Sequence, residues 1–85
     1  MSVEVTVTFP KGVSVNEVSA ALIAAMEAQD YQVDGQLAHQ EATVNDHFVI
    51  IDTWENEAKL NAFLHEFALP AFESAGIPTP DINIS

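Results

Sequence analysis

The sequence predicts an α+β fold in which four strands and two helices follow one another in the order β-α-β-β-α-β. Apolar residues at alternate positions, or on both faces of a short run, indicate strands at 3–9, 36–44, 47–54 and 82–84. Apolar residues spaced three and four apart indicate helices that begin near Val15 and after Asn56. A chain of 85 residues has room for one domain, residues 1–85, and not for two.

The first strand and the first helix have clear limits in the sequence. The run from Val3 to Phe9 alternates apolar with polar residues, and Pro10-Lys11-Gly12 ends it. Ser14 and Glu17 have the spacing of a capping box, in which Ser14 caps the helix and Glu17 reaches back to it. The helix is expected to fade near Gln29-Asp30, and its apolar stripe is Val15, Val18, Leu22 and Met26.

The second half of the chain starts with a hairpin. Asn45-Asp46 predicts a two-residue turn between strands 36–44 and 47–54. The strand at 47–54 is apolar on both faces, which is typical of a central strand. Asn56 caps the second helix, and Leu69-Pro70 must break or kink it before a short turn at 71–75 ends at Gly76. The inner stripe of this helix is Leu60, Phe63, Leu64 and Phe67.

This element order is the ferredoxin-like pattern, with the first and third strands central and both helices on one face of the sheet. We expect the helix face to carry Val3, Val5, Val7, Val49 and Ile51. The open face would then carry Leu37, Phe48, Ile50 and Trp54, which should not remain in water. A homodimer that packs sheet against sheet would cover them, and the alternative is a monomer with a partly wet apolar sheet.

A turn at Asn45-Asp46 fixes the register of the hairpin. His39 then lies directly opposite Asp52, and Leu37 lies opposite Trp54. Opposed residues have Cβ atoms about 5 Å apart, which is close enough for a hydrogen-bonded His–Asp pair. A slip by one residue would send His39 to the other face, so the pairing is a strict test of the predicted hairpin.

Two stretches of the chain resemble a known group of proteins. They are His39 through His47-Phe48-Val49-Ile50-Ile51-Asp52-Thr53-Trp54-Glu55-Asn56, and Leu69-Pro70-Ala71-Phe72-Glu73-Ser74-Ala75-Gly76-Ile77-Pro78. Over roughly residues 37–82 they resemble the antibiotic biosynthesis monooxygenase-like domains of the dimeric α/β-barrel superfamily, in particular an uncharacterised bacterial branch. The resemblance implies a dimer with a barrel-like interior that in some members holds a small hydrophobic ligand. Cofactor-free oxygenases, haem-degrading enzymes and lactone isomerases share this fold, so the fold alone does not select a reaction.

His39 and Asp52 are the predicted catalytic residues. A carboxylate beside a semi-buried imidazole fixes its tautomer, and His39 could then take a proton from an acidic, phenol-like substrate. The alternative is a purely structural hydrogen bond inside an interface. Glu41 lies on the same face as the pair, but one His and two carboxylates on a flat strand are a weak metal signal, and no metal is predicted.

Trp54 is predicted to bind substrate by stacking, together with Leu37, Phe48 and Ile50 on the same face and Tyr31 as a pocket lid. For Tyr31 the alternative is packing on the end of the first helix. His47 is expected to be exposed on the opposite face, and His65 falls off the apolar stripe of the second helix.

Composition excludes several classes of function. Thirteen acidic residues against two basic ones give a net charge of −11, which argues against nucleic-acid partners and anionic membranes. The absence of cysteine excludes disulfides and thiol chemistry, and no phosphate-binding loop or nucleophile elbow is present, so no cofactor is predicted. No targeting signal or membrane-spanning run is present, because the longest apolar run, Ala20 to Met26, is too short, and a cytoplasmic protein is expected.

The sequence therefore predicts a small-molecule-binding protein, or a cofactor-independent monooxygenase-like enzyme that acts on an apolar or aromatic substrate. The alternative is a non-catalytic dimeric interaction domain or regulatory domain. An enzyme or binding protein needs a cavity of about 300 Å³ or more, whereas an interaction domain should be filled by its own side chains.

Overall fold

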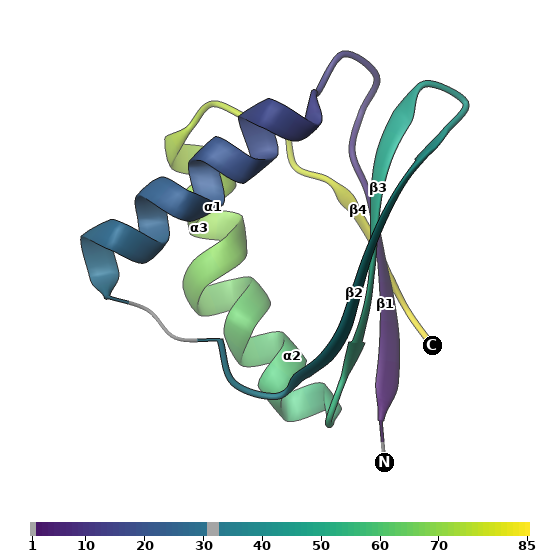
Figure 1. Ribbon diagram of the computed structural model, residues 1–85, viewed down its shortest axis with the longest axis vertical. Helices are drawn as coiled ribbons and strands as arrows, with labels where there is room; N and C mark the ends of the chain where they lie inside the picture. Colours follow the sequence, from purple (N-terminus) through teal and green to yellow (C-terminus); the bar gives the residue numbers. More distant parts are fainter. Residues whose placement is uncertain (1, 31–32) are drawn as a thin grey trace.

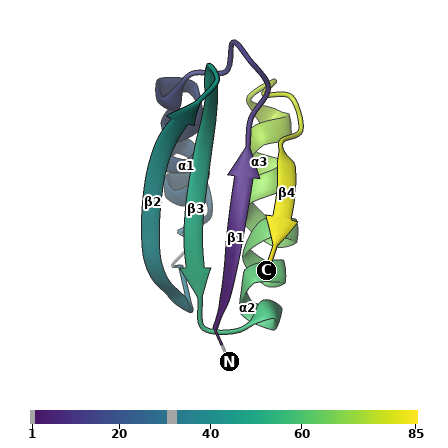
Figure 2. The same ribbon diagram turned by 90° about the vertical axis from the view of Figure 1, so that its right-hand side faces the viewer.

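A computed structural model describes residues 2–30 and 33–85 and has the predicted order of elements. The strands form one antiparallel sheet in the order β2-β3-β1-β4, so the first and third strands are central, as predicted for a ferredoxin-like fold (Figure 2). The elements are β1 (Val3–Thr8), α1 (Val15–Gln29), β2 (Gln36–Val44), β3 (His47–Trp54), α2 (Glu57–Phe63), the π-helix η1 (Leu64–Ala68), α3 (Leu69–Ser74) and β4 (Asp81–Ile84).

All helical segments lie on one side of the sheet, and the other side carries no helix (Figures 1 and 2). The core therefore fills the space between the helices and one face of the sheet. From the sheet it includes Val5, Val7, Phe48, Ile50 and Trp54, and from the helices Val18, Leu60, Leu64, Phe67 and Phe72. Val15, which the sequence placed in the apolar stripe of α1, is 41% exposed, because the buried side of α1 centres on Val18 and Ala21.

The predicted assignment of β3 side chains to the two faces is wrong. Val5 pairs with Asp52 and Val7 pairs with Ile50, and directly opposed residues share a face of the sheet. Phe48, Ile50, Asp52 and Trp54 therefore face the helices, while Val49 and Ile51 lie on the open face. The sequence could not settle this point, because β3 is apolar at both sets of alternate positions and either set could have faced the core.

The β2–β3 hairpin forms as predicted at the turn and departs from the prediction at its far end. Asn45 and Asp46 both have positive φ, 52° and 66°, as a two-residue type I′ turn requires. His39 lies opposite Asp52, which confirms the predicted register. The register shifts between Gln36 and Ala38, so Gln36 and not Leu37 lies opposite Trp54.

The second helix does not break at Leu69-Pro70, where the sequence predicted a break or a kink, but its α-helical register is interrupted there by η1. The chain stays helical from α2 through η1 into α3, and the π-helical turn ends directly before Leu69-Pro70. Proline has no N–H to donate to the preceding turn, and a π-helical register is one way in which a continuous helix accommodates that loss. The result is that η1, rather than a loop, supplies Leu64, Phe67 and Ala68 to the core. None of the helices among the described residues is long and apolar enough to span a membrane.

Candidate functional site

A cavity of about 240 Å³ lies between the sheet and the helices. Its wall is almost wholly apolar, and among the described residues the polar side chains in that wall are Gln36, His39, Asp52 and the indole of Trp54. No described lysine lies in the wall. The apolar lining consists of Val5, Val7, Leu22, Met26, Val33, Ile50, Leu60, Phe63, Leu64, Ala68, Leu69, Phe72, Pro80 and Ile82.

The polar group in this wall is built by the β2–β3 hairpin. Antiparallel pairing places His39 opposite Asp52, and His39 Nδ1 lies 2.6 Å from Asp52 Oδ1. Glu41 lies two residues further along β2 on the same face, and its Oε2 is 3.0 Å from His39 Nε2. The Asp52 side chain is 9% exposed, whereas those of His39 and Glu41 are each 44% exposed. The three groups thus run from the cavity wall out to solvent.

The two bonded groups respond differently to burial. Burial lowers the pKa of His39, but hydrogen bonds to Glu41 and Asp52 outweigh it and raise the pKa above its usual 6.5. For Asp52 burial is the largest influence and raises the pKa above 3.8, although the hydrogen bond from His39 opposes that shift. The cause of the shift therefore differs between the two groups. The partners of half-exposed His39 stabilise its charged form, whereas burial destabilises the charged form of Asp52.

Trp54 lines the same cavity and carries a buried indole N–H. The residue is fully buried, and its Nε1 has no hydrogen-bond partner among the described residues. Its ring packs against Phe63, with ring centroids 4.9 Å apart. A buried indole N–H without a partner costs roughly 1–3 kcal/mol. Such a group at a cavity wall is a candidate donor to a ligand oxygen.

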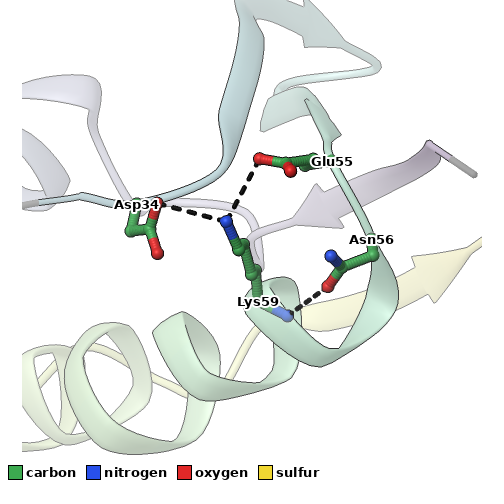
Figure 3. A network of polar contacts seen from close by, with 4 residues as sticks. All are labelled: Asp34, Glu55, Asn56 and Lys59. Carbon is green, nitrogen blue, oxygen red and sulfur yellow. Dashed lines mark hydrogen bonds and ion pairs between the residues drawn. The ribbon is translucent and has the colours of Figure 1, made fainter.

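A network of polar contacts holds the segment that leads into β2 beside this cavity. Lys59 Nζ on α2 lies 3.4 Å from Asp34 Oδ1 and 3.2 Å from Glu55 Oε2 (Figure 3). Gly35 has a φ of +94°, and a Cβ built there would lie 2.6 Å from Lys59 Cδ, so the lysine stem lies directly against the backbone of the segment. Val33 and Gln36, on either side of this contact, both line the cavity.

The structure brings together part of the predicted site. His39, Asp52, Trp54 and Ile50 all line the cavity. Phe48 does not, because it lies in the core further along β3, stacked on Phe9 with ring centroids 5.7 Å apart. Leu37 is 61% exposed at the β2 irregularity and lies outside the cavity wall. Tyr31, the predicted lid, lies outside the described residues.

Several residues of the cavity were not predicted as site residues. Gln36 enters the wall because of the register shift in β2, and no pattern in the sequence signals that shift. Leu60, Phe63 and Leu64 were predicted as core, which is correct, but a helical apolar stripe does not reveal whether it packs tightly or borders a void. His47 is half-buried rather than exposed, because its Nδ1 lies 2.7 Å from the Phe9 backbone oxygen. His65 is exposed, as predicted.

The acidic groups that the structure describes are not arranged as a metal site. Among residues 2–30 and 33–85 no group of three or more His, Asp or Glu side chains is arranged to hold a metal ion. Asp52 and Glu41 bond opposite ring nitrogens of His39 and so point toward the imidazole rather than toward a common centre.

Solved structures of other proteins share this fold. A conserved protein from Methanosarcina mazei matches with a TM-score of 0.68 at 14% identity over 100% of this chain and 91% of its own. SnoaB, a cofactor-independent oxygenase from Streptomyces nogalater, matches with a TM-score of 0.67 at 16% identity over 99% of this chain and 90% of its own. A candidate antibiotic biosynthesis monooxygenase from Chloroflexus aurantiacus matches with a TM-score of 0.59 at 15% identity over 100% and 91%.

These similarities establish the fold, which is the ferredoxin-like α+β fold of the antibiotic biosynthesis monooxygenase-like proteins, as the sequence resemblance predicted. No protein-family description matches the chain, and no curated protein matches it by sequence.

Proposed function

We propose that this protein binds a small, neutral, apolar or aromatic molecule in the cavity between sheet and helices, and acts on it as a cofactor-independent monooxygenase-like enzyme. The observation that carries the proposal is the composition of the cavity wall. An apolar space of about 240 Å³ is lined by the hydrogen-bonded His39–Asp52 pair and by Trp54, whose buried indole N–H has no partner among the described residues. The likeness in fold to SnoaB, an oxygenase without a cofactor, supports the same class of function.

The chemistry of the wall restricts the ligand. The apolar lining selects an apolar body. The volume of about 240 Å³ falls short of the ~300 Å³ expected of an enzyme or binding protein, so the cavity suits only a small ligand. No described lysine lies in the wall and the chain carries a net charge of −11, so anionic ligands are disfavoured. Trp54 Nε1–H can donate to a carbonyl or hydroxyl oxygen, and the His39–Asp52 pair can accept a proton from a weakly acidic O–H or C–H group.

The proposed reaction needs no cofactor because the substrate supplies all the electrons. Removal of a proton from an activated methylene group leaves an electron-rich carbanion, which reacts with dioxygen. In the net reaction one methylene group and one molecule of dioxygen give one carbonyl group and one molecule of water. The carbon loses four electrons, and the four electrons reduce both oxygen atoms, of which one enters the substrate and one leaves as water. The protein contributes the base, the hydrogen bond to the substrate oxygen and an apolar enclosure.

Ligand binding can be tested through the one tryptophan of the chain. Trp54 gives a single indole N–H signal in a ¹H–¹⁵N NMR spectrum, and that signal should move when a ligand oxygen accepts its hydrogen bond. We would titrate 2-naphthol, naphthalene and 2-naphthoate. The expected result is a large shift with 2-naphthol, a smaller one with naphthalene, which has no acceptor oxygen, and the weakest binding for the 2-naphthoate anion. An indole signal that none of the three moves would refute the proposed site.

The enzymatic part of the proposal is tested with anthrone, an apolar tricyclic ketone that carries an activated methylene group. We expect one dioxygen consumed for each anthraquinone formed, at a rate above the uncatalysed oxidation. The Asp52→Asn variant should lose at least about 100-fold of that rate, as expected when either the general base or the group that orients it is removed. Ligand binding without any dioxygen uptake would favour the regulatory ligand-binding function instead.

We further propose that the protein is a homodimer that packs through the open face of its sheet. That face, corrected for the register of β3, carries small and apolar side chains together with polar ones such as Glu4, Gln40 and Asp81. The small and apolar ones are Thr6, Thr8, Ala42, Val44, Val49 and Ile51. A second copy is the economical cover for such a face. Light scattering after size exclusion should give a dimer for the wild type, a monomer for Ile51→Glu, and an unchanged dimer for Ile23→Glu, an equal charge change at a 56% exposed position of α1. A monomeric wild type would refute the proposal.

A further inference from the structure

His39 stands between two carboxylates and has no free ring nitrogen. Nδ1 lies 2.6 Å from Asp52 Oδ1, and Nε2 lies 3.0 Å from Glu41 Oε2. An ionised carboxylate only accepts hydrogen bonds, so each contact requires an N–H on the ring. A ring that donates from both nitrogens is an imidazolium. The geometry therefore describes His39 as a cation, which cannot also serve as a proton acceptor.

We infer that Glu41 is a positioning residue that holds His39 as an imidazolium, and that Asp52 is the group of the pair that receives the substrate proton. This inference rests on the proposed function and assigns the roles within its site. It differs from the sequence-based expectation that His39 is the base and Asp52 its orienting partner.

The placement of the three groups supports this division. Asp52 is the buried member and lies in the cavity wall, with its Oδ1 bonded to His39. Its second oxygen is not used by that bond, and Gln36, which also lines the wall, lies close enough to the carboxylate to lower its pKa. Glu41 is 44% exposed and does not line the cavity, so it touches His39 and not the ligand. The raised pKa of Asp52, caused mainly by burial, makes it a stronger base than an ordinary aspartate.

The charges balance through the proton-transfer step. Before transfer, Asp52 and Glu41 are negative, His39 is positive and the ligand is neutral. After transfer, Asp52 is neutral and the ligand carries the negative charge, while His39 and Glu41 are unchanged. The imidazolium therefore faces a negative charge throughout, first on Asp52 and then on the ligand. In a chain with two lysines and no arginine, a protonated histidine is the cation that the cavity wall can supply.

Among the described residues, two charged side chains act on His39. They are Asp52 on the neighbouring strand β3 and Glu41 on its own strand β2. No charged side chain of the helices that pack on this face contributes to its pKa among the described residues. Removal of the Glu41 charge should therefore have a direct effect on the ring.

NMR titration of the histidine rings tests the inference in the intact protein. In wild type at pH 7.5 we expect both His39 nitrogens to show protonated shifts. Glu41→Gln should move the His39 titration to lower pH, and the rising limb of the anthrone rate-versus-pH profile should change with it. Glu66→Gln is the matched control, since it removes one exposed negative charge from η1 without contact to His39.

The outcomes separate this inference from the proposed function. A neutral His39 in wild type at pH 7.5, or equal titration shifts in Glu41→Gln and Glu66→Gln, would overturn the inference. If 2-naphthol still moves the Trp54 signal in that case, the proposed cavity site stands and His39 is the base. A protonated His39 in a protein that binds none of the three aromatic molecules would leave the charge assignment in place and refute the proposed function.

Discussion

Replacement of Ala68 by leucine fills the cavity from the helix side. Ala68 lies on η1, is 2% exposed and lines the cavity, so the new side chain enters the empty space. Leucine adds three carbon groups, and at about 0.8 kcal/mol for each buried group the gain is at most ~2.4 kcal/mol. Fixing the leucine rotamer costs about 0.5–1 kcal/mol. The net expectation is roughly 1.5 kcal/mol of added stability and a Tm about 6–12 °C higher.

The assay combines thermal unfolding with ligand binding. Ala58→Leu is the matched control, because Ala58 is an exposed residue of α2 and the same substitution there should change stability by less than about 0.5 kcal/mol. Ala68→Leu should be more stable than wild type and should bind 2-naphthol at least ~10-fold more weakly. Such an inverse relation between stability and binding is expected where a space is kept open for a ligand.

One result would refute this reasoning directly. If Ala68→Leu lowers the stability by about 1 kcal/mol or more, the added side chain meets packed atoms, and the space beside η1 is not available to a ligand. Unchanged 2-naphthol binding in a stabilised Ala68→Leu protein would show that the ligand occupies another place.

Two further predictions concern the charged pair. Asp52→Asn keeps an oxygen that can accept from His39 Nδ1 but removes a buried charge. The variant should therefore equal the wild type in stability at pH 7.5, or exceed it by at most about 1 kcal/mol, while it abolishes anthrone turnover. A large drop in Tm would mean that the pair is primarily structural. The free energy of unfolding should also fall as the pH rises. Because the folded pKa of Asp52 is raised, stability decreases as the pH rises from 3.8 through that pKa. The raised pKa of His39 gives stability that is complete below pH 6.5 and is lost as the pH rises through its folded pKa. Melting curves from pH 5 to 9 should show this decline, and a His39→Gln variant with an equally steep decline above pH 6.5 would contradict it.

The sequence predicts most of the fold because local signals agree with one another. Ser14 and Asn56 cap the helices as expected, with Oγ and Oδ1 accepting from the N–H groups of Glu17 and Lys59. The Asn45-Asp46 turn fixes the register that pairs His39 with Asp52. These features depend on a few neighbouring residues and can be found without knowledge of the tertiary structure.

The parts that the sequence did not predict depend on the packing of distant segments. The residues of β3 are apolar at both sets of alternate positions, so the sequence pattern did not show which set faces the helices. The pairing of β3 with β1 shows that Ile50 and Trp54 face them. The cavity is the space that remains when helix and sheet side chains fail to fill the interior, and no local pattern encodes it. The Glu41 contact, which occupies the second nitrogen of His39, is local to β2, but Glu41 was considered from the sequence only as part of a weak metal signal.

The strand that carries His39 and Glu41 is the least protected element of the sheet. β2 lies at the edge, and all nine of its residues are exposed. Local opening of such a strand costs far less free energy than global unfolding. Detachment of β2 would separate His39 from Asp52 while the core around Phe67 stays folded, and hydrogen exchange would register it as fast amides confined to residues 36–44. Whatever covers or binds this edge therefore controls how much of the time the charged pair is assembled.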